Sequence, residues 1–183
     1  MVDFSPISIQ RGATMIEVLV TMVILVFGLL GLAGLQARLQ VSEMESYQRA
    51  QALILLEDMA NRITTNRSAA AGYVTGSPLG AGMTCPTDTS TVQKVDAKEW
   101  CDALQGAAET SGVSKVGAMI GARGCVESVI ANEYLVTVAW QGLASISAPP
   151  DSVTCGQNAY DGGACTNDRC RRAITTVVRI GTL

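Results

Sequence analysis

The stretch that decides the fold is RGATMIEVLVTMVILVFGLLGLAGLQA, residues 11–37. From Val18 to Ala37, no side chain in this stretch carries a charge. At 1.5 Å per residue, a helix of this length spans about 30 Å, which is the hydrocarbon thickness of a bilayer. The sequence therefore predicts one helix that crosses a membrane or fills the core of a helical assembly.

One acidic residue, Glu17, stands immediately before the uncharged run. A carboxylate at mid-depth in a membrane costs ~2.5–3.5 kcal/mol, and less near an interface. We therefore expect Glu17 to have a cationic partner. The alternative is that its carboxylate lies in the headgroup layer.

The spacing of Gly12, Ala13 and Glu17 resembles the processing site of the type IV pilins and their relatives. In that family a hydrophilic leader ends in glycine, and a new first residue, three uncharged residues and a glutamate follow. The resemblance implies that a prepilin peptidase cuts between Gly12 and Ala13 and N-methylates the freed amine, although the family usually has phenylalanine where this chain has Ala13. It also implies that Glu17 pairs with the amine of a neighbouring subunit, which neutralises both charges in only one axial register.

Two other interpretations of the N-terminal segment stay open. An ordinary secretory signal would be cut near Gly31-Leu32-Ala33, whereas a plain one-span anchor would not be cut at all. The apolar run is longer than a typical signal core, and only Arg11 marks a positive flank. Neither interpretation gives a reason for Glu17.

The composition limits the function classes. A chain of 183 residues suffices for one compact domain with an N-terminal appendage. Its net charge of −3 and pI near 4.9 argue against a general nucleic-acid binder. The chain has no histidine, so a serine or cysteine nucleophile lacks its usual base, and no pair of carboxylates has a catalytic spacing. We predict a protein that is not an enzyme and that holds no metal or cofactor.

The cysteines all follow the apolar run, and their even number predicts disulfides in an oxidising compartment. We expect three, or at least two, disulfides, but the sequence does not choose among the possible pairings. For the two cysteines nearest the C-terminus we expect a structural disulfide rather than a zinc site. The six are Cys85, Cys101, Cys125, Cys155, Cys165 and Cys170.

A single long helix is predicted from Ala13 to about Asn66, because this segment contains no proline and is rich in good helix formers. Up to Gln36 apolar residues cover every face. We expect Glu45 and Arg49 to lie on the exposed side of the second half. The apolar stripe that we expect to face the globular body is Leu53, Leu56, Ala60 and Ile63.

Three glycines, Gly28, Gly31 and Gly34, recur in the apolar half. Each costs ~1 kcal/mol relative to alanine inside a helix. They indicate either close packing against another helix or a stretch that unwinds on assembly.

The C-terminal two thirds read as a small α+β body. Residues 72–86 are predicted to form a loop, and residues 96–104 a short helix. Two strands are expected at 133–140 and 172–180, paired antiparallel, with a third at about 125–130.

Two C-terminal segments, VTVAWQG at 136–142 and RRAITTVVRI at 171–180, resemble the PilV-type minor pilins. The resemblance implies a disulfide-stapled pilin fold of the α+β class, with a long N-terminal helix on a small antiparallel sheet. It divides the chain into a leader at 1–12, a hydrophobic half-helix at 13–37, and a periplasmic globular domain at 38–183 that includes the amphipathic half-helix 38–66.

The same resemblance implies a minor pilin of the type IV pilus, acting in a priming or tip complex that supports pilus assembly, twitching motility and adhesion. Its expected partners are other minor pilins, the major pilin, a PilY-type tip adhesin, the prepilin peptidase and the inner membrane, and by default no nucleic acid. The precursor would sit in the inner membrane with a periplasmic body, and the mature subunit in the extracellular pilus, at or near its tip. Rival interpretations are a minor pseudopilin of a type II secretion system, a DNA-uptake minor pilin, and a membrane-tethered periplasmic enzyme.

Charged residues gather in two places near the C-terminus. We expect Arg169, Arg171 and Arg172 to protect a solvated strand edge rather than to contact DNA. The spacing of Asp151, Asp161 and Asp168 does not match a calcium loop of the EF-hand type.

Overall fold

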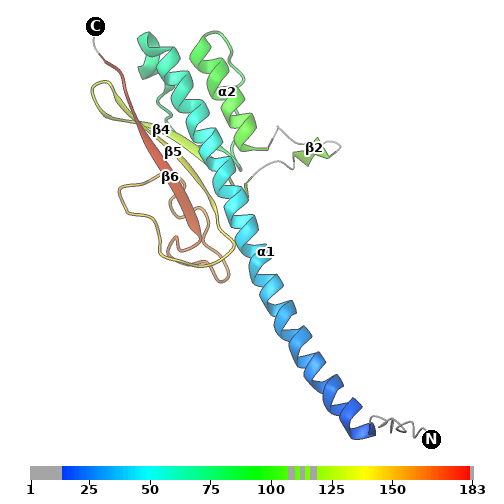
Figure 1. Cartoon of the computed structure of the whole chain (residues 1–183). Coiled ribbons are helices and arrows are strands. Elements are labelled where there is room, and N and C mark those ends of the chain that lie inside the picture. Colours follow the sequence, from blue (N-terminus) through cyan, green and yellow to red (C-terminus); the bar gives the residue numbers. More distant parts are fainter. Residues whose placement is uncertain (1–13, 107–109, 112–113, 116–118, 182–183) are drawn as a thin grey trace, which may run out of the picture. The chain divides into compact units, whose positions relative to one another are not determined.

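The computed structural model describes residues 14–106, 110–111, 114–115 and 119–181. The chain divides into two compact units, Met1–Glu43 and Met44–Leu183. The first unit contains the apolar part of the long helix, and the second unit contains the rest of that helix and all of the sheet (Figure 1).

Helix α1 runs without interruption over Met15–Thr65, a length of 51 residues. This confirms the predicted long helix. The helix ends where Asn66 donates its backbone N–H to Arg62 O, and a 3-10 helix, η1, continues the chain over Arg67–Tyr73. The first two residues of the predicted loop at 72–86 therefore belong to η1.

The face of α1 that packs on the body differs from the predicted stripe. Leu53 is 42% exposed, so the stripe was wrong there, whereas Ala60 is half-buried and packs against the core. The contact follows steps of four and three residues that begin at a polar side chain, Gln48, which a search for large apolar residues passes over. The buried residues are Gln48, Ala52, Leu56, Met59 and Ile63.

Four antiparallel strands form the main sheet in the order β1-β4-β5-β6. They are β1 Leu79–Gly80, β4 Arg123–Ile130, β5 Glu133–Gln141 and β6 Arg171–Arg179. The three longer strands and the antiparallel pairing of β5 with β6 were predicted. Strand β1 was not predicted, because two residues carry no periodicity. A separate two-stranded sheet joins β2, Thr110–Ser111, to β3, Ser114–Lys115.

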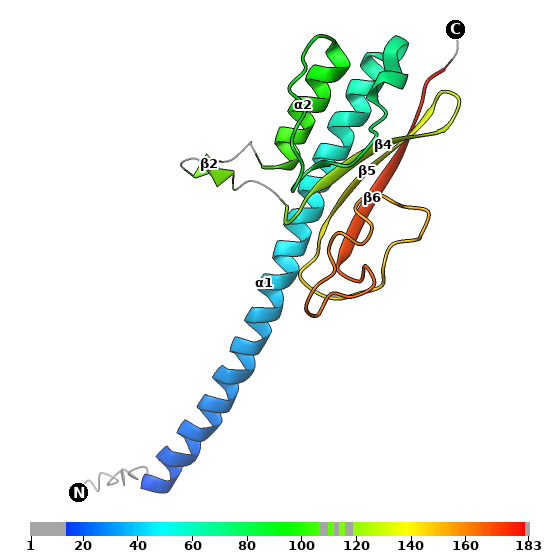
Figure 2. The ribbon, with the colours of Figure 1, turned by 180° about the vertical axis from the view of Figure 1, so that it is seen from behind.

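The inner face of the main sheet carries the hydrophobic core, under α1 and under helix α2, Val92–Leu104. Figures 1 and 2 show the two helices side by side next to the sheet. The indole Nε1 of Trp100 on α2 donates to Leu55 O on α1 at 2.9 Å. A Cβ at Gly124 would lie only 2.3 Å from the Trp100 ring, so glycine is what lets α2 approach strand β4. Helix α2 begins four residues before the predicted start at 96, with Thr91 as its N-cap.

Part of the outer face of the sheet is covered by the long loop between β5 and β6, while Thr175 and Val177 on that face are exposed. The Cys125–Cys155 disulfide fastens this loop to β4, and Cys165–Cys170 closes its end. The third disulfide, Cys85–Cys101, joins the segment after β1 to α2. All six cysteines are therefore paired, as predicted, and the structure supplies the pairing that the sequence left open.

The three disulfides close loops of different length, which predicts different contributions to stability. On the chain-entropy relation, the Cys125–Cys155 bridge, with a sequence separation of 30, contributes about 3.6 kcal/mol, and Cys165–Cys170, with a separation of 5, about 2 kcal/mol. In each of two variants, both cysteines of one bridge are replaced by serine. Urea denaturation of the full chain in detergent, followed by tryptophan fluorescence, measures the free energy of unfolding of each variant. If removing the shorter bridge lowered this free energy as much as removing the longer one, or more, the ranking would be contradicted.

Candidate functional site

The most unusual surface of the protein is the first half of α1. Every residue from Met15 to Met44 is exposed to solvent in the described chain. Fully burying a large apolar side chain is worth about 1.5–3 kcal/mol, and this segment carries many of them, including Leu25, Phe27 and Leu30 at 63–70% exposure. The chain's own described residues do not bury this surface, so its favourable environment must come from outside the chain.

Helix α1 contains a segment that is long and apolar enough to cross a membrane, with a mean hydropathy of 2.7 in its best window. None of that window is buried inside the protein. A core helix of a soluble domain would be mostly covered. Either a lipid bilayer or a bundle of like helices would remove this apolar surface from water.

Glu17 occupies the first turn of α1. Its backbone N–H lies 3.0 Å from Thr14 O and 3.4 Å from Thr14 Oγ1, so Thr14 acts as the N-cap and Glu17 stands three residues later. This is the threonine-x-x-glutamate spacing of a capping box, a local role that the sequence analysis did not consider. No cation contacts the Glu17 carboxylate among residues 14–106, 110–111, 114–115 and 119–181. Gly12 and Ala13 lie outside the described residues.

The glycines of the apolar half are not required by contacts within the chain. A Cβ built on Gly28, Gly31 or Gly34 would meet nothing within 4 Å. Because these glycines have no side chain, a neighbouring helix can approach α1 closely at these positions. The same glycines also lower the local stability of α1.

A polar contact fastens α1 to the sheet near the start of the second unit. The Oε1 atom of Glu45 accepts from the backbone N–H groups of Leu143 and Ala144, at 3.1 and 3.3 Å, and from Arg172 Nη2 at 3.1 Å. Arg172 also donates to Ala144 O at 2.8 Å. A Cβ on Gly142 would lie 2.5 Å from the guanidinium carbon, so glycine makes room for this side chain. We call these residues the Glu45 clamp.

The clamp corrects one sequence-based expectation. Glu45 was placed on the exposed side with Arg49, but it is half-buried and pairs with Arg172, which is more than one hundred residues away in sequence. Arg49 is exposed as predicted, and no local signal identifies Arg172 as the partner of Glu45.

The arginine cluster near the C-terminus had been expected to protect a solvated strand edge, and this expectation was wrong. Arg171 is buried, with its Nε 3.1 Å from Asp168 Oδ2, and its Nη1 donates to Val153 O and Cys155 O. It therefore holds the covering loop against the sheet. Arg172 belongs to the Glu45 clamp, and only Arg169 is exposed.

The aspartates considered for calcium have structural roles or lie apart. Asp168 accepts from Asn158 N at 2.7 Å and pairs with Arg171, and Asp161 accepts from the Asp168 backbone N–H at 2.9 Å. Asp151 lies exposed in the same loop and makes no hydrogen bond or ion pair with the other two within the described residues. In the described part of the chain, no group of three acidic, cysteine or histidine residues is arranged to hold a metal ion.

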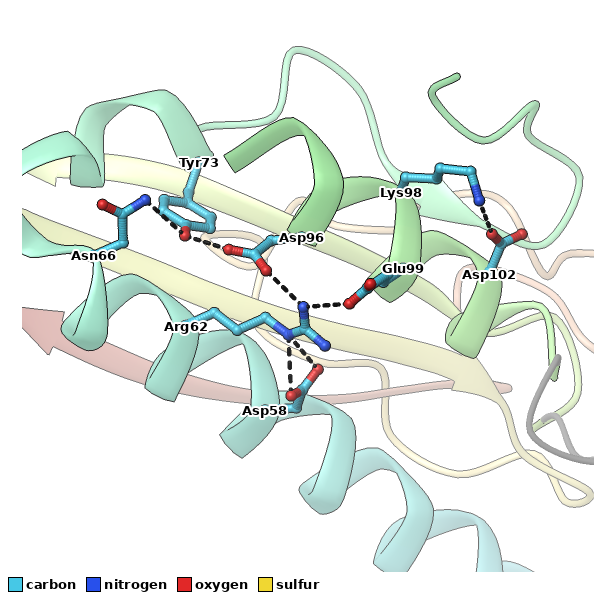
Figure 3. Close-up of polar contacts among 8 residues, drawn as sticks. All are labelled: Asp58, Arg62, Asn66, Tyr73, Asp96, Lys98, Glu99 and Asp102. Atoms are coloured by element: carbon cyan, nitrogen blue, oxygen red, sulfur yellow. Dashed lines mark hydrogen bonds and ion pairs between the residues drawn. The ribbon is translucent and has the colours of Figure 1, made fainter. Parts of the chain in front are cut away.

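A second polar network joins the end of α1 to α2 and η1 (Figure 3). Arg62 contacts three carboxylates, with its Nε 3.0 Å from Asp58 Oδ2 and its Nη1 2.6 Å from Asp96 Oδ1 and 2.8 Å from Glu99 Oε2. Burial lowers the pKa of Arg62, but its hydrogen bonds to Glu99, Asp96 and Asp58 outweigh this effect and raise the pKa above its usual value. The guanidinium therefore stays charged and fixes the two helices together.

Tyr73 extends the network from η1. Its hydroxyl donates to Asp96 Oδ2 at 2.5 Å and accepts from Asn66 Nδ2 at 3.2 Å. Burial, with a further contribution from the hydrogen bond to Asp96, raises the pKa of Tyr73 to about 12. Such a phenol is a poor general base at neutral pH, so the network supplies rigidity rather than chemistry.

Neither the Glu45 clamp nor the Arg62 network was found by sequence reasoning. Arg62 and Asp58 stand four residues apart, which is a local signal for the first contact only. The contacts to α2 and β6 depend on tertiary packing.

Compared with known proteins, the chain matches no family model, no curated protein and no solved structure.

The clamp predicts a local effect of substitution. In the Glu45→Ala variant, the amides of Leu143 and Ala144 should lose protection in hydrogen exchange, because their acceptor is removed. Replacing Glu43, which is exposed, by alanine is the matched control and should leave both amides protected. Unchanged protection in Glu45→Ala would show that the clamp does not hold the loop.

The raised pKa of Tyr73 predicts alkaline destabilisation. The unfolded phenol ionises near pH 10 and the folded one near 12, so its stabilising effect is complete below pH 10 and is lost as the pH rises to 12. Urea unfolding midpoints across this range should therefore fall less steeply in Tyr73→Phe than in the parent chain. Equal slopes would contradict the assignment.

Proposed function

We propose that this chain is a minor subunit of a type IV pilus, made as a membrane-anchored precursor and then assembled with like subunits through its N-terminal helix. The observation that carries the proposal is the fully exposed apolar half of α1, with Glu17 at its start and no cation beside that carboxylate in the described chain. A bundle of processed helices supplies both missing parts, an apolar environment and a terminal amine.

Two further features support this proposal. The leader motif around Gly12 and Ala13 resembles that of the prepilins, and the body carries three disulfides, which suit a periplasmic location. The body then presents a sheet, its covering loop and α2 for lateral contacts with other minor pilins, the major pilin or a tip adhesin.

The rival functions have less support. Of the three clustered arginines only Arg169 is exposed, which leaves little of the proposed DNA contact. A minor pseudopilin of a type II secretion system would share the leader and the helix, and neighbouring genes discriminate between the two. We infer no enzyme activity, since the described polar networks bind and position other parts of the chain.

N-terminal processing tests the proposal. Mass spectrometry of the protein from cells with and without the prepilin peptidase should show a mature chain that begins at Ala13 only when the peptidase is present. A chain that begins at Met1 in both strains, or near Gly34, would overturn the proposal.

A second test separates insertion from assembly. Glu17→Ala should still insert into the membrane, because it removes a charge from an apolar helix, but its amount in sheared pili should fall at least tenfold. Glu43→Ala provides the matched control, since it removes an exposed carboxylate from the same helix. Normal incorporation of Glu17→Ala would show that no pairing between subunits is needed.

A further inference from the structure

The segment that follows β5 is an exposed loop without charge. Every residue from Leu143 to Ala148 is exposed, and Leu143 and Ile146 are 42% and 49% accessible. The loop ends at Pro149-Pro150. Two large apolar side chains of this loop are therefore only partly covered by the described residues of the second unit.

The backbone beside the two apolar side chains of this loop is partly hydrogen-bonded within the protein. The N–H groups of Leu143 and Ala144 donate to Glu45, and Ile146 N–H donates to Arg169 O at 2.9 Å. Ala144 O accepts from Arg172 at 2.8 Å, and Ile146 O accepts from Arg169 Nε at 3.4 Å. Leu143 and Ile146 can therefore contact the upper part of the acyl chains with these backbone groups already paired, while the other polar groups of the loop stay at the hydrated interface.

The loop is attached to α1 close to the apolar segment. Glu45 follows Ala37, the last residue of the uncharged run, by eight residues. Eight residues span about 12 Å as a helix. Even fully extended they reach no more than about 28 Å. When residues 18–37 lie in a bilayer, the loop is therefore tethered within reach of its headgroup layer.

The charged side chain that is hydrogen-bonded to the loop at Ile146 is positive, while the exposed Asp151 follows Pro150 one residue beyond the loop. Arg169 is exposed and bonded to Ile146 through both backbone and side chain, while Arg172 is occupied by Glu45. Loop residues 143–150 carry no acid, although the whole chain has a net charge of −3. Apolar side chains next to an exposed arginine fit the boundary between acyl chains and anionic headgroups.

We propose that Leu143 and Ile146, with Arg169, form a second membrane contact that docks the body on an anionic lipid surface. This inference rests on the membrane-anchored precursor of the proposed function. The contact orients the body before assembly, and it must be released when the subunit leaves the bilayer.

The test uses the full chain in vesicles of phosphatidylethanolamine and phosphatidylglycerol, with bromine on the upper part of the acyl chains as quencher. The reporter is Leu143→Trp, since Trp100 and Trp140 are buried in the body, at 0% and 4% exposure. Val92→Trp, at an exposed position on α2, is the matched control. The Leu143→Trp fluorescence should be quenched and the Val92→Trp fluorescence should not.

A charge variant tests the lipid specificity. Adding Arg169→Gln to Leu143→Trp should lower the ratio of docked to undocked protein about fivefold, because one cation near an anionic surface contributes ~1 kcal/mol. In vesicles of phosphatidylcholine alone, which carry no net charge, the ratio of docked to undocked protein should fall by a similar factor. Ile146→Trp repeats the measurement from a second position in case Leu143→Trp perturbs the loop.

The outcomes separate this inference from the proposed function. Carbonate extraction first shows whether α1 is embedded, and release of the protein would overturn the anchored precursor and the docking together. If α1 is embedded but both loop reporters are quenched no more than Val92→Trp, only the docking is overturned. The docking alone is also overturned if the bilayer does not affect the fluorescence of the loop reporters and only the addition of other pilins changes it. The loop would then be an interface with another protein.

Discussion

An apolar helix surface that the chain cannot bury by itself is the constraint on which this structure depends. From Met15 to Met44, α1 is exposed on all sides, and its large side chains gain free energy only in lipid or against other helices. In either environment water is excluded, so a carboxylate in the first turn requires a cation or a place at the interface. This one segment therefore places a constraint on Glu17, the acid in its first turn, that the described chain does not meet by itself.

The second unit is built to hold the other half of the same helix. Its contact face begins at Gln48, and two polar arrangements secure it, the Glu45 clamp to β6 and the Arg62 network to α2. Between them the apolar core of α1, α2 and the sheet provides most of the burial. On the opposite face of the sheet, disulfides and the buried Arg171 keep a long irregular loop in place of a further layer of regular structure. The body is thus fastened to residues 45–63 of α1, while the described chain leaves residues 15–43 exposed.

Sequence periodicity predicted the elements well and their contacts poorly. The uncharged run and the alternation at 133–140 are strong local signals, and the corresponding helix and strand were found within a residue or two. The buried stripe was missed at Leu53 because Gln48 and Ala52 take the central contact positions, and a polar or small residue gives no apolar signal. Arg171 and Arg172 were predicted to lie at a solvated edge because charged residues are usually exposed. In the structure Arg171 pairs with Asp168 in the adjoining loop, and Arg172 pairs with Glu45 on α1. The cysteine pairing likewise depends on topology, which local patterns do not contain.

The central claim is that the Glu17 carboxylate pairs, in the assembled fibre, with an amine that proteolysis creates on another subunit. The most direct measurement is zero-length carbodiimide coupling of sheared pili, followed by peptide mass spectrometry of the products. The account predicts an amide bond between Glu17 and the N-terminal amine of a neighbouring pilin. Coupling confined to the subunit's own Ala13, or an unmodified Glu17 in fibres where other carboxylates react, would contradict it.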